Sequence, residues 1–384
     1  IPRDPQNLGI SEMLTWVYIQ QKDYNMALRQ IIALDKRLKE GGERIYDFSR
    51  LLLSNQEYET AIDALNYILG KGTENQLYIP AKVELINAKS KMLTSGKFSA
   101  TELKELEGQY MELLTEFGKG ARTAFAIRQL ARLQAFHLHK PKEAEVLLED
   151  LLETRGLTPQ VIGQTKLELG DIYIHTGEMW EANLIYAQVE KQFANEPIGQ
   201  EAKFRNGRLS YFQGDFTWAK AQLDVLKSST SQLIANDALN LSLLINDNLQ
   251  NSNDSAALKM YAQADLQVLL DQDQKALTIL DSIDIRYPGH SLTDDILMSR
   301  AKIHLRSGNA TAAAGYLQQI IDNYSYDLWA DDALFMLADL SEHQLQQPEK
   351  AQVLYERIIT DYPGSLFVIE ARKRFRILRG DKIG

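Results

Sequence analysis

The sequence predicts an all-α protein made of stacked antiparallel helix pairs, and three observations lead to this prediction. An alanine recurs just after a turn, at the start of an apolar helical run. Most intervals between these alanines hold two stretches in which apolar residues follow i, i+3, i+4 and i+7, the period of a helix. No stretch alternates apolar and polar residues as a half-buried strand does. The anchor alanines are Ala27, Ala61, Ala144, Ala182, Ala219, Ala276, Ala313 and Ala351.

The spacing of the anchor alanines defines the repeat. Successive spacings are 34, 83, 38, 37, 57, 37 and 38 residues, so five of the seven lie between 34 and 38. We interpret the interval of 83 as two periods, with a divergent unit near residues 98–117. The interval of 57 predicts one period plus an extra helix. We place that helix at 256–270, after a polar turn cluster at 250–255, and expect it to bend the stack.

Turn residues mark where the predicted helices begin and end. Glycines 177, 214 and 308 separate the two helical stretches of their units, where glycine adopts the left-handed conformation that ends a helix. Tyrosines 287, 324 and 362 stand at successive junctions between units, 37 and 38 residues apart. Side chains that can cap a helix N-terminus follow or precede several junctions. The predicted N-caps are Thr158 before Pro159, Ser291 followed by Asp294, and Ser365.

The chain length agrees with a repeat architecture. A single compact core rarely exceeds roughly 250–300 residues, and this chain has 384. A solenoid grows without enlarging one core, because each helix pair buries its apolar face against its neighbours. We therefore expect one solenoid over residues 1–384, with about nine helix pairs and a final helix at 366–378. Its parts are N-terminal repeats at 1–69, a divergent repeat at 70–120, central repeats at 121–227, an irregular unit with the inserted helix at 228–272, and C-terminal repeats with the final helix at 273–384.

These units resemble tetratricopeptide repeats, in which a small residue in the first helix, a glycine turn and an alanine opening the second helix recur. The best-matching unit has Gly170, Tyr173, Gly177, Ala182 and Tyr186 at these positions, with a proline at the next junction. The resemblance implies a right-handed α-α superhelix that acts as a protein-binding scaffold. The family's large aromatic residue early in the first helix is mostly missing, and several periods exceed 34 residues.

The junction at 362–365 reads Tyr-Pro-Gly-Ser, and 287–291 reads Tyr-Pro-Gly-His-Ser. These junctions resemble those of bacterial cell-envelope members of the family, such as outer-membrane-protein assembly lipoproteins and the periplasmic coordinator of the Tol–Pal system. The resemblance implies a protein of the bacterial periplasm or one associated with the outer membrane. A cytoplasmic adaptor, or a regulatory module of a larger protein, is the alternative.

Catalytic chemistry is not expected from the sequence. Cysteine is absent, which excludes thiolate nucleophiles and thiolate metal sites. None of the common zinc-protease, hydrolase or phosphate-binding motifs occurs. His137 and His139 point to different sides of a helix, so we favour exposed histidines over a metal site. The acidic pairs 294–295 and 331–332 suit a helix N-terminus better than they suit metal binding. We therefore predict no catalytic residue, no metal and no cofactor.

The charge distribution excludes a general phosphate-binding surface. The formal net charge is −10, and we expect no nucleic-acid partner. No apolar run approaches the ~18 residues of a membrane span. A basic run near the C-terminus is either the outer face of a final helix, which we favour, or a patch for anionic ligands. Its members are Arg372, Lys373, Arg374, Arg376, Arg379 and Lys382.

The resemblance also implies a partner surface, because first helices line the concave face of tetratricopeptide arrays. Aromatic and arginine side chains, which are enriched at binding hot spots, fall on these helices. The paired asparagine and lysine residues that bind C-terminal carboxylates in related proteins are not reproduced. We expect a protein or peptide partner and leave the oligomeric state open. The candidate partner-binding residues are Arg128, Arg132, Asp171, His175, Arg208, Tyr211, Lys302 and Arg306.

Overall fold

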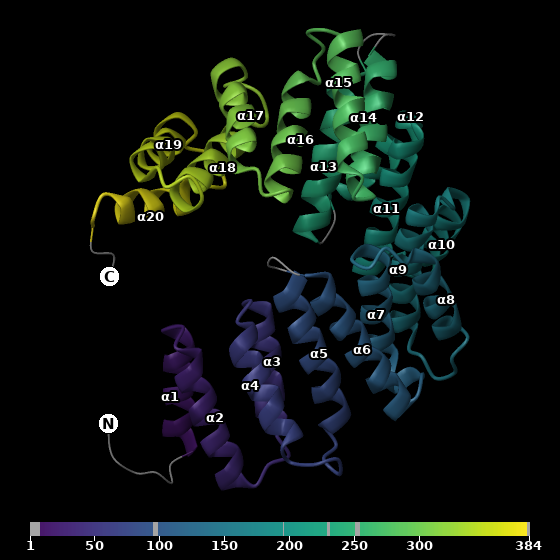
Figure 1. Cartoon of the computed structure of the whole chain (residues 1–384), viewed down its shortest axis with the longest axis vertical. Coiled ribbons are helices and arrows are strands. Elements are labelled where there is room, and N and C mark those ends of the chain that lie inside the picture. Colours follow the sequence, from purple (N-terminus) through teal and green to yellow (C-terminus); the bar gives the residue numbers. More distant parts are fainter. Residues whose placement is uncertain (1–7, 95–98, 195, 229–230, 250–253, 382–384) are drawn as a thin grey trace. The chain divides into compact units, whose positions relative to one another are not determined.

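The computed structural model describes residues 8–94, 99–194, 196–228, 231–249 and 254–381. Within these ranges the chain forms twenty α-helices and no strand, which confirms the all-α prediction (Figure 1). The contacts divide the chain into two compact units. We call residues 1–194 the N-terminal unit and residues 195–384 the C-terminal unit. That the two form one continuous solenoid stays a prediction.

Over residues 8–94 and 99–194 the N-terminal unit holds five helix pairs, and the two helices of each pair pack against each other. A short 3₁₀ helix, Ala121–Thr123, precedes the fourth pair. The pairs are α1 (Leu8–Gln20) with α2 (Tyr24–Leu38), α3 (Glu43–Ser54) with α4 (Tyr58–Leu69), α5 (Tyr78–Thr94) with α6 (Ala100–Phe117), α7 (Ala124–Phe136) with α8 (Pro141–Leu152), and α9 (Pro159–Thr176) with α10 (Met179–Gln192).

The described residues of the C-terminal unit form four helix pairs and two single helices. Its first pair is followed by a single helix, and another single helix ends the unit. The pairs are α11 (Pro197–Gln213) with α12 (Phe216–Leu226), α14 (Asp254–Leu269) with α15 (Asp273–Arg286), α16 (Thr293–Arg306) with α17 (Ala310–Asn323), and α18 (Ala330–His343) with α19 (Pro348–Asp361). The single helices are α13 (Gln232–Asp247) and α20 (Val368–Leu378).

The anchor alanines occupy one structural position. All eight are completely buried, and each is the fourth residue of the second helix of its pair. A methyl side chain there lets the two helices of a pair approach closely. In the divergent pair α5–α6 the equivalent fourth residue is Leu103, which is 3% exposed. A leucine in place of the alanine explains why the sequence spacing doubles to 83 across this pair.

The inserted helix is α13, and its placement at 256–270 was wrong. The predicted segment does form a helix, α14, but α14 pairs with α15 and packs back against α11, the first helix of the preceding pair. It is therefore a regular member of the repeat, because Ala276 anchors its partner α15. The extra residues between Ala219 and Ala276 belong to α13. The polar cluster at 250–255 lies largely outside the described residues.

Close packing in one pair depends on a glycine. A Cβ atom on Gly170 of α9 would lie 2.3 Å from Cε1 of Tyr186 in α10. Tyr186 is completely buried, and its hydroxyl donates to Asp171 Oδ1 at 2.8 Å. The predicted turn glycines 177, 214 and 308 all have positive φ angles, between 76° and 85°. The glycine pattern in the sequence is therefore confirmed at both kinds of position.

Two of the three predicted N-caps are wrong. Thr158 caps α9, accepting a hydrogen bond from the backbone N–H of Val161 at 3.3 Å. Helix α16 begins only at Thr293, and Ser291 Oγ donates to Asn248 Oδ1 instead. Ser365 accepts from the N–H of Phe367 at 3.1 Å, within the turn before α20. The serines therefore stabilise the junction turns, and Ser291 ties its turn to α13.

Candidate functional site

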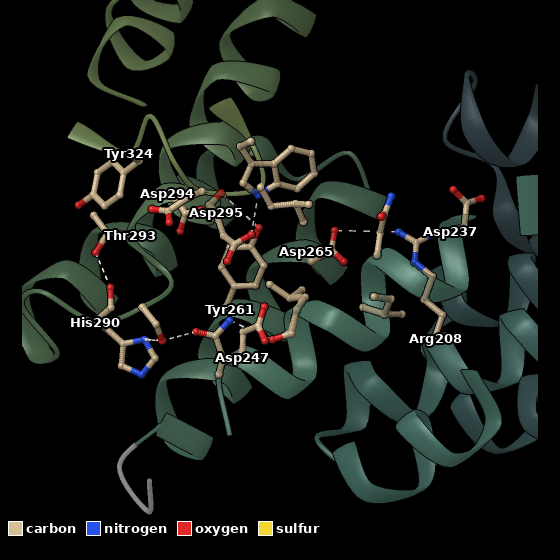
Figure 2. Close-up of a pocket in the computed structure, with 18 of the residues that line it drawn as sticks. Arg208, Asp237, Asp247, Tyr261, Asp265, His290, Thr293, Asp294, Asp295 and Tyr324 are labelled. Carbon is tan, nitrogen blue, oxygen red and sulfur yellow. Dashed lines mark hydrogen bonds and ion pairs between the residues drawn. The ribbon is translucent and has the colours of Figure 1, made fainter. Parts of the chain in front are cut away.

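A pocket of about 730 Å³ lies in the C-terminal unit, where α13 interrupts the regular repeat (Figure 2). Its walls come from α11, α13, α14 and the first turn of α16, together with the junction turns that precede α16 and α18. One face of α13 supplies a wall, because its lining residues recur at helical spacing. They are Asp237, Asn240, Leu241, Leu244, Asp247 and Asn248. The pocket therefore exists at the same place where the regular repeat is interrupted, because the inserted helix forms one of its walls.

The charged lining of the pocket is strongly acidic. Six aspartates line it, against a single arginine, Arg208. In Figure 2, Arg208 and Asp237 lie at one side and His290 and Tyr324 at the other, with Asp265, Asp294 and Asp295 between them. We call this site the acidic pocket; its aspartates are Asp237, Asp247, Asp265, Asp294, Asp295 and Asp327. Apolar and aromatic side chains complete the walls, namely Phe204, Leu241, Leu244, Tyr261, Tyr324, Leu328 and Trp329.

Asp295 is held by groups from two neighbouring helix pairs. The indole N–H of Trp329 donates to Asp295 Oδ1 at 2.7 Å. The hydroxyl of Tyr261 donates to the backbone oxygen of Asp295 at 3.3 Å. The ammonium of Lys302 lies 4.3 Å from the centre of the Trp329 ring, within range of a cation–π interaction. Trp329 therefore stands between a carboxylate and a cation, which fixes its orientation in the pocket wall.

Burial is the largest cause of the raised pKa values of the carboxyl groups in the pocket. It raises the pKa of Asp295 to about 7, the negative charge of Asp294 adds to the effect, and the hydrogen bond from Trp329 opposes it. Burial also raises the pKa of Asp294, with a further contribution from Asp327. The pKa of Asp265 is raised by burial, while Arg208 and Lys302 counteract it. Loss of water likewise lowers the pKa of the Lys302 ammonium.

The junction turn before α16 contains a serine and a histidine but no activated nucleophile. Ser291 Oγ lies 3.4 Å from His290 Nδ1. That nitrogen accepts the backbone N–H of Leu292 at 3.1 Å, and the serine hydroxyl donates to Asn248. The serine proton is therefore directed away from the histidine, so this pair is not arranged for general-base catalysis.

Two of the candidate partner-binding residues belong to the acidic pocket or its border. Arg208 lines the pocket, with Nη2 4.0 Å from Asp265 Oδ1 and its guanidinium 5.1 Å from the centre of the Phe212 ring. Lys302 borders the pocket through its contact with Trp329. Both residues, predicted from the sequence as partner-binding residues of a concave face, thus lie at or beside this pocket, and their binding role stays a prediction.

The expectation that Tyr211 is presented to a partner is wrong. The side chain is completely buried in the core of the C-terminal unit, against Phe212 and Phe216. Its hydroxyl has no hydrogen-bond partner within the described residues, and burial raises its pKa well above the usual value. Tyr211 precedes Phe212 on a helix with little amphipathic pattern, so sequence periodicity could not separate core from surface here.

Arg306 has a structural partner within the chain. Its guanidinium pairs with Asp271 at 3.0 Å and with Asp273, and it donates to the backbone oxygen of Val268 at 3.2 Å. These contacts tie the end of α16 to the turn between α14 and α15. Arg306 is partly exposed, but its donors already serve the packing of neighbouring pairs.

The remaining four candidates lie in the N-terminal unit. Arg128 forms a two-pronged ion pair with Glu168, with both N–O distances 2.7 Å, and its side chain is 12% exposed. Arg132 is exposed and lies 3.9 Å from the same carboxylate. Asp171 accepts a hydrogen bond from Tyr186, and the ring of His175 packs edge-on against Phe136 at 4.8 Å. Arg132 alone among these four is largely exposed.

Sequence reasoning missed most of the acidic pocket. Asp294 and Asp295 do lie in the first turn of α16, and Asp331 and Asp332 in that of α18, as the helix-dipole interpretation predicts. The burial of the first pair, however, depends on α13 and on the turn carrying Trp329, which are distant in sequence. The extra residues between Ala219 and Ala276 were the available signal that this part of the stack is irregular.

Other expected features have ordinary surroundings. In the part of the chain that the structure describes, no group of three or more histidine and acidic residues could hold a metal ion, and no helix is long and apolar enough to cross a membrane. His137 ends α7, and His139 adopts a positive φ in the following turn. In the basic run, Arg374 pairs with Glu370 at 3.0 Å, and Arg379 pairs with Asp381 at 2.5 Å.

Comparisons with known proteins gave one family match and several similar solved structures. The tetratricopeptide repeat family model matches residues 332–365, which span most of α18 and all of α19. No curated protein matches the sequence. Among solved structures, a tetratricopeptide repeat protein from Parabacteroides merdae is similar at 12% identity, covering 88% of this chain and 99% of that chain, with a TM-score of 0.27.

Two further solved structures are similar at comparable identity. The TPR domain of P58(IPK) is 14% identical, with 98% of this chain and 99% of that chain covered and a TM-score of 0.27. A monomeric mutant of IFIT1 with m7Gppp-AAAA is 15% identical, with 97% and 82% covered and a TM-score of 0.37. The family match identifies a tetratricopeptide repeat at residues 332–365, and the repeated helix pairs with their buried anchor alanines give the described residues a tetratricopeptide-like architecture.

Proposed function

We propose that the protein is a non-enzymatic scaffold that binds a segment of a partner protein in the acidic pocket. The tetratricopeptide architecture is typical of scaffolds that bind proteins. The observation that carries the proposal is the pocket itself, whose volume of about 730 Å³ lies in the range of ligand-binding clefts. Its walls combine charged, amide, aromatic and aliphatic groups, which suits a peptide segment better than a single small ion.

The geometry favours binding over catalysis. Asp295 is engaged by Trp329, Ser291 by Asn248, and Arg208 lies beside Asp265. These contacts hold the walls of the pocket in place and leave no nucleophile paired with a base. An enzyme site between the repeats is therefore the weaker hypothesis.

We also propose that the scaffold works in a bacterial cell-envelope assembly, in the periplasm or at the outer membrane. The support is the resemblance of the tyrosine junctions, and these do occupy equivalent places, since Tyr287, Tyr324 and Tyr362 each end the second helix of a pair. A cytoplasmic adaptor is the alternative. Fractionation of cells that produce the protein from its native gene tests this: recovery with the periplasm or outer membrane supports the envelope, and recovery only in cytosol contradicts it.

Site-specific cross-linking tests the binding site. A photo-reactive amino acid replaces Asn240, which is exposed and lines the pocket, or Leu239, its exposed neighbour on α13 that does not. The full chain carrying either probe is irradiated in cells, and the cross-linked segment is mapped by mass spectrometry. That segment is then synthesised as a peptide and titrated against the unmodified full chain.

The proposal predicts that position 240 cross-links to one defined segment, that position 239 does so far less, and that the synthetic peptide binds the full chain. Replacing Leu244, an apolar pocket-lining residue, by arginine fills the pocket and should weaken this peptide's binding at least about tenfold. Equal cross-linking from both positions, or a peptide whose affinity is unchanged by Leu244→Arg, would contradict the proposed site.

A further inference from the structure

Among the described residues, Asp294 is a buried residue whose carboxylate forms no ion pair. The residue is 9% exposed, lies in the first turn of α16 and lines the acidic pocket. The backbone N–H groups of Asp294 and Asp295 face its carboxylate. Within the described residues no ion pair and no side-chain hydrogen bond reaches it. Buried charges in proteins are normally paired, because removal from water is costly.

Neighbouring charges make this lack of a counter-ion more costly. The charges of Asp327 and Asp247 act on Asp294 in the same direction as burial, raising its pKa. All three residues line the acidic pocket. A cation entering between them would relieve both the repulsion and the burial of an uncompensated charge.

The described cations at the pocket and at its border, Arg208 and Lys302, are already engaged. Arg208 is shared between Asp265 and the ring of Phe212. The Lys302 ammonium lies over the Trp329 ring. Neither forms an ion pair with Asp294, so the charge of Asp294 is left for a group from outside the chain.

The walls around this charge suit a long cationic side chain. The rings of Tyr261, Tyr324 and Trp329 line the pocket, and aromatic faces attract guanidinium and ammonium groups. The pocket also has an aliphatic surface, formed by Leu241, Leu244 and Leu328. A metal ion or an ammonium ion would leave this surface uncovered. The aliphatic stem of a lysine or arginine side chain, with the adjoining peptide, would cover it. Leu328 is 53% exposed, so part of this aliphatic surface is open to solvent.

We infer that the acidic pocket binds an arginine or lysine side chain of an extended partner segment, with Asp294 as its principal counter-ion and Asp327 and Asp247 in support. This inference rests on the proposed function and adds the chemistry of the partner. It differs from capture of an acidic C-terminus, because the pocket's own charge is negative.

A peptide titration with the full chain tests the inference. The probe is a fluorescein-labelled peptide of about nine residues, made of glycine, serine and leucine with one central arginine. The matched probe carries citrulline, which has the shape of arginine without its charge. Argininamide is the small-molecule competitor. We expect the arginine probe to bind at least about tenfold more tightly than the citrulline probe, with the difference falling at high salt.

Variants of the chain show which aspartates cause the preference for the arginine probe. Asp294→Asn preserves the shape of the side chain and should weaken the arginine probe about tenfold, without affecting the citrulline probe. Asp327→Asn changes an exposed position and should weaken binding of the arginine probe about threefold. This variant replaces Asp294→Asn in the test if Asp294→Asn does not fold. Glu356→Gln removes one charge from an exposed site on α19 and is the matched control, expected to leave binding unchanged.

Three results would overturn the inference: equal binding of the arginine and citrulline probes, insensitivity to both aspartate substitutions, or argininamide binding as tightly as the peptide. The last would indicate a small organic cation in place of a protein segment. The proposed function fails separately. If position 240 cross-links to a protein whose segment shows no arginine or lysine dependence, the scaffold role stands and this inference is wrong.

Discussion

Trp329 and Asp295 lie 34 residues apart, on successive helix pairs, and their side chains are joined by a hydrogen bond of 2.7 Å. The bond links the junction turn before α18 to the first turn of α16. It buries one polar group from each of two successive helix pairs, and both groups line the acidic pocket. The contact that holds the stack together here therefore also shapes the site.

Loss of the indole donor should destabilise the C-terminal unit. Trp329→Phe leaves a buried carboxyl oxygen without its hydrogen bond, which costs about 1–3 kcal/mol. The pKa of Asp295 should rise further, because that hydrogen bond lowers it. Denaturant unfolding monitored by circular dichroism measures the change. Trp218→Phe, at a tryptophan that is 56% exposed, is the matched control and should cost less than about 0.5 kcal/mol.

The raised pKa of Asp295 predicts how stability depends on pH. Its carboxyl group titrates near pH 7 in the folded chain and at its ordinary value of 3.8 when unfolded. Between these two pH values Asp295 is protonated in the folded chain and ionised in the unfolded chain. The stability that this protonation contributes is therefore fully present below about pH 4 and is lost as the pH rises towards 7.

Asp295→Asn keeps the acceptor for Trp329 and removes the titration. Between pH 4 and pH 7 the wild-type chain should lose about 3 kcal/mol of stability relative to this variant. Unfolding free energies at several pH values measure the difference, with Glu356→Gln expected to follow the wild type. A constant difference between wild type and Asp295→Asn across this range would show that Asp295 titrates normally.

Close approach of α9 and α10 predicts opposite effects for two glycine substitutions in the N-terminal unit. Gly170→Ala drives a methyl group into the ring of Tyr186 and should destabilise the unit by about 1–3 kcal/mol. Gly108→Ala, in α6, meets no atom within 4 Å and should stabilise by up to about 1 kcal/mol, because alanine favours the helix. Thermal and denaturant unfolding distinguish them, and equal effects would contradict the packing described for Gly170.

Substitutions of Arg128 and Arg132 should differ sharply in their effect on the free energy of unfolding, although both side chains approach Glu168. Arg128→Met removes the two-pronged partner of a carboxylate whose side chain is only 9% exposed, at a cost of about 3 kcal/mol. Arg132→Met removes a cation that is 57% exposed and 3.9 Å away, at a cost below about 0.5 kcal/mol. Comparable losses of unfolding free energy for the two variants would contradict a structural role particular to Arg128.

The sequence predicted the parts of the fold that depend on local pattern. The eight anchor alanines, the turn glycines and the tyrosine junctions were predictable, because each is fixed by the contact between adjacent helices. The divergent pair was located by its spacing, and the leucine at position 103 explains why its anchor was not recognised. The inserted helix was detected by the same spacing but assigned to α14, since both segments have helical composition and neither carries an anchor.

The candidate site was less predictable, because its burial arises from tertiary packing. Arg208 and Lys302, which the sequence placed on first helices as candidate groove residues, lie at or beside the pocket. Tyr211 was misassigned, since a tyrosine on such a helix can face the core or the surface. The burial of Asp294 and the pairing of Asp295 with Trp329 depend on the position of α13 and of a junction turn, which helical periodicity does not encode.

Hydrogen–deuterium exchange of the full chain, with and without a saturating concentration of the central-arginine peptide, tests the central claim most directly. The account predicts slowed exchange in α13 and in the junction turns at 287–292 and 324–329, and none of this slowing in the Asp294→Asn variant. Unchanged exchange in these segments, or slowing confined to helices that do not line the acidic pocket, would contradict it.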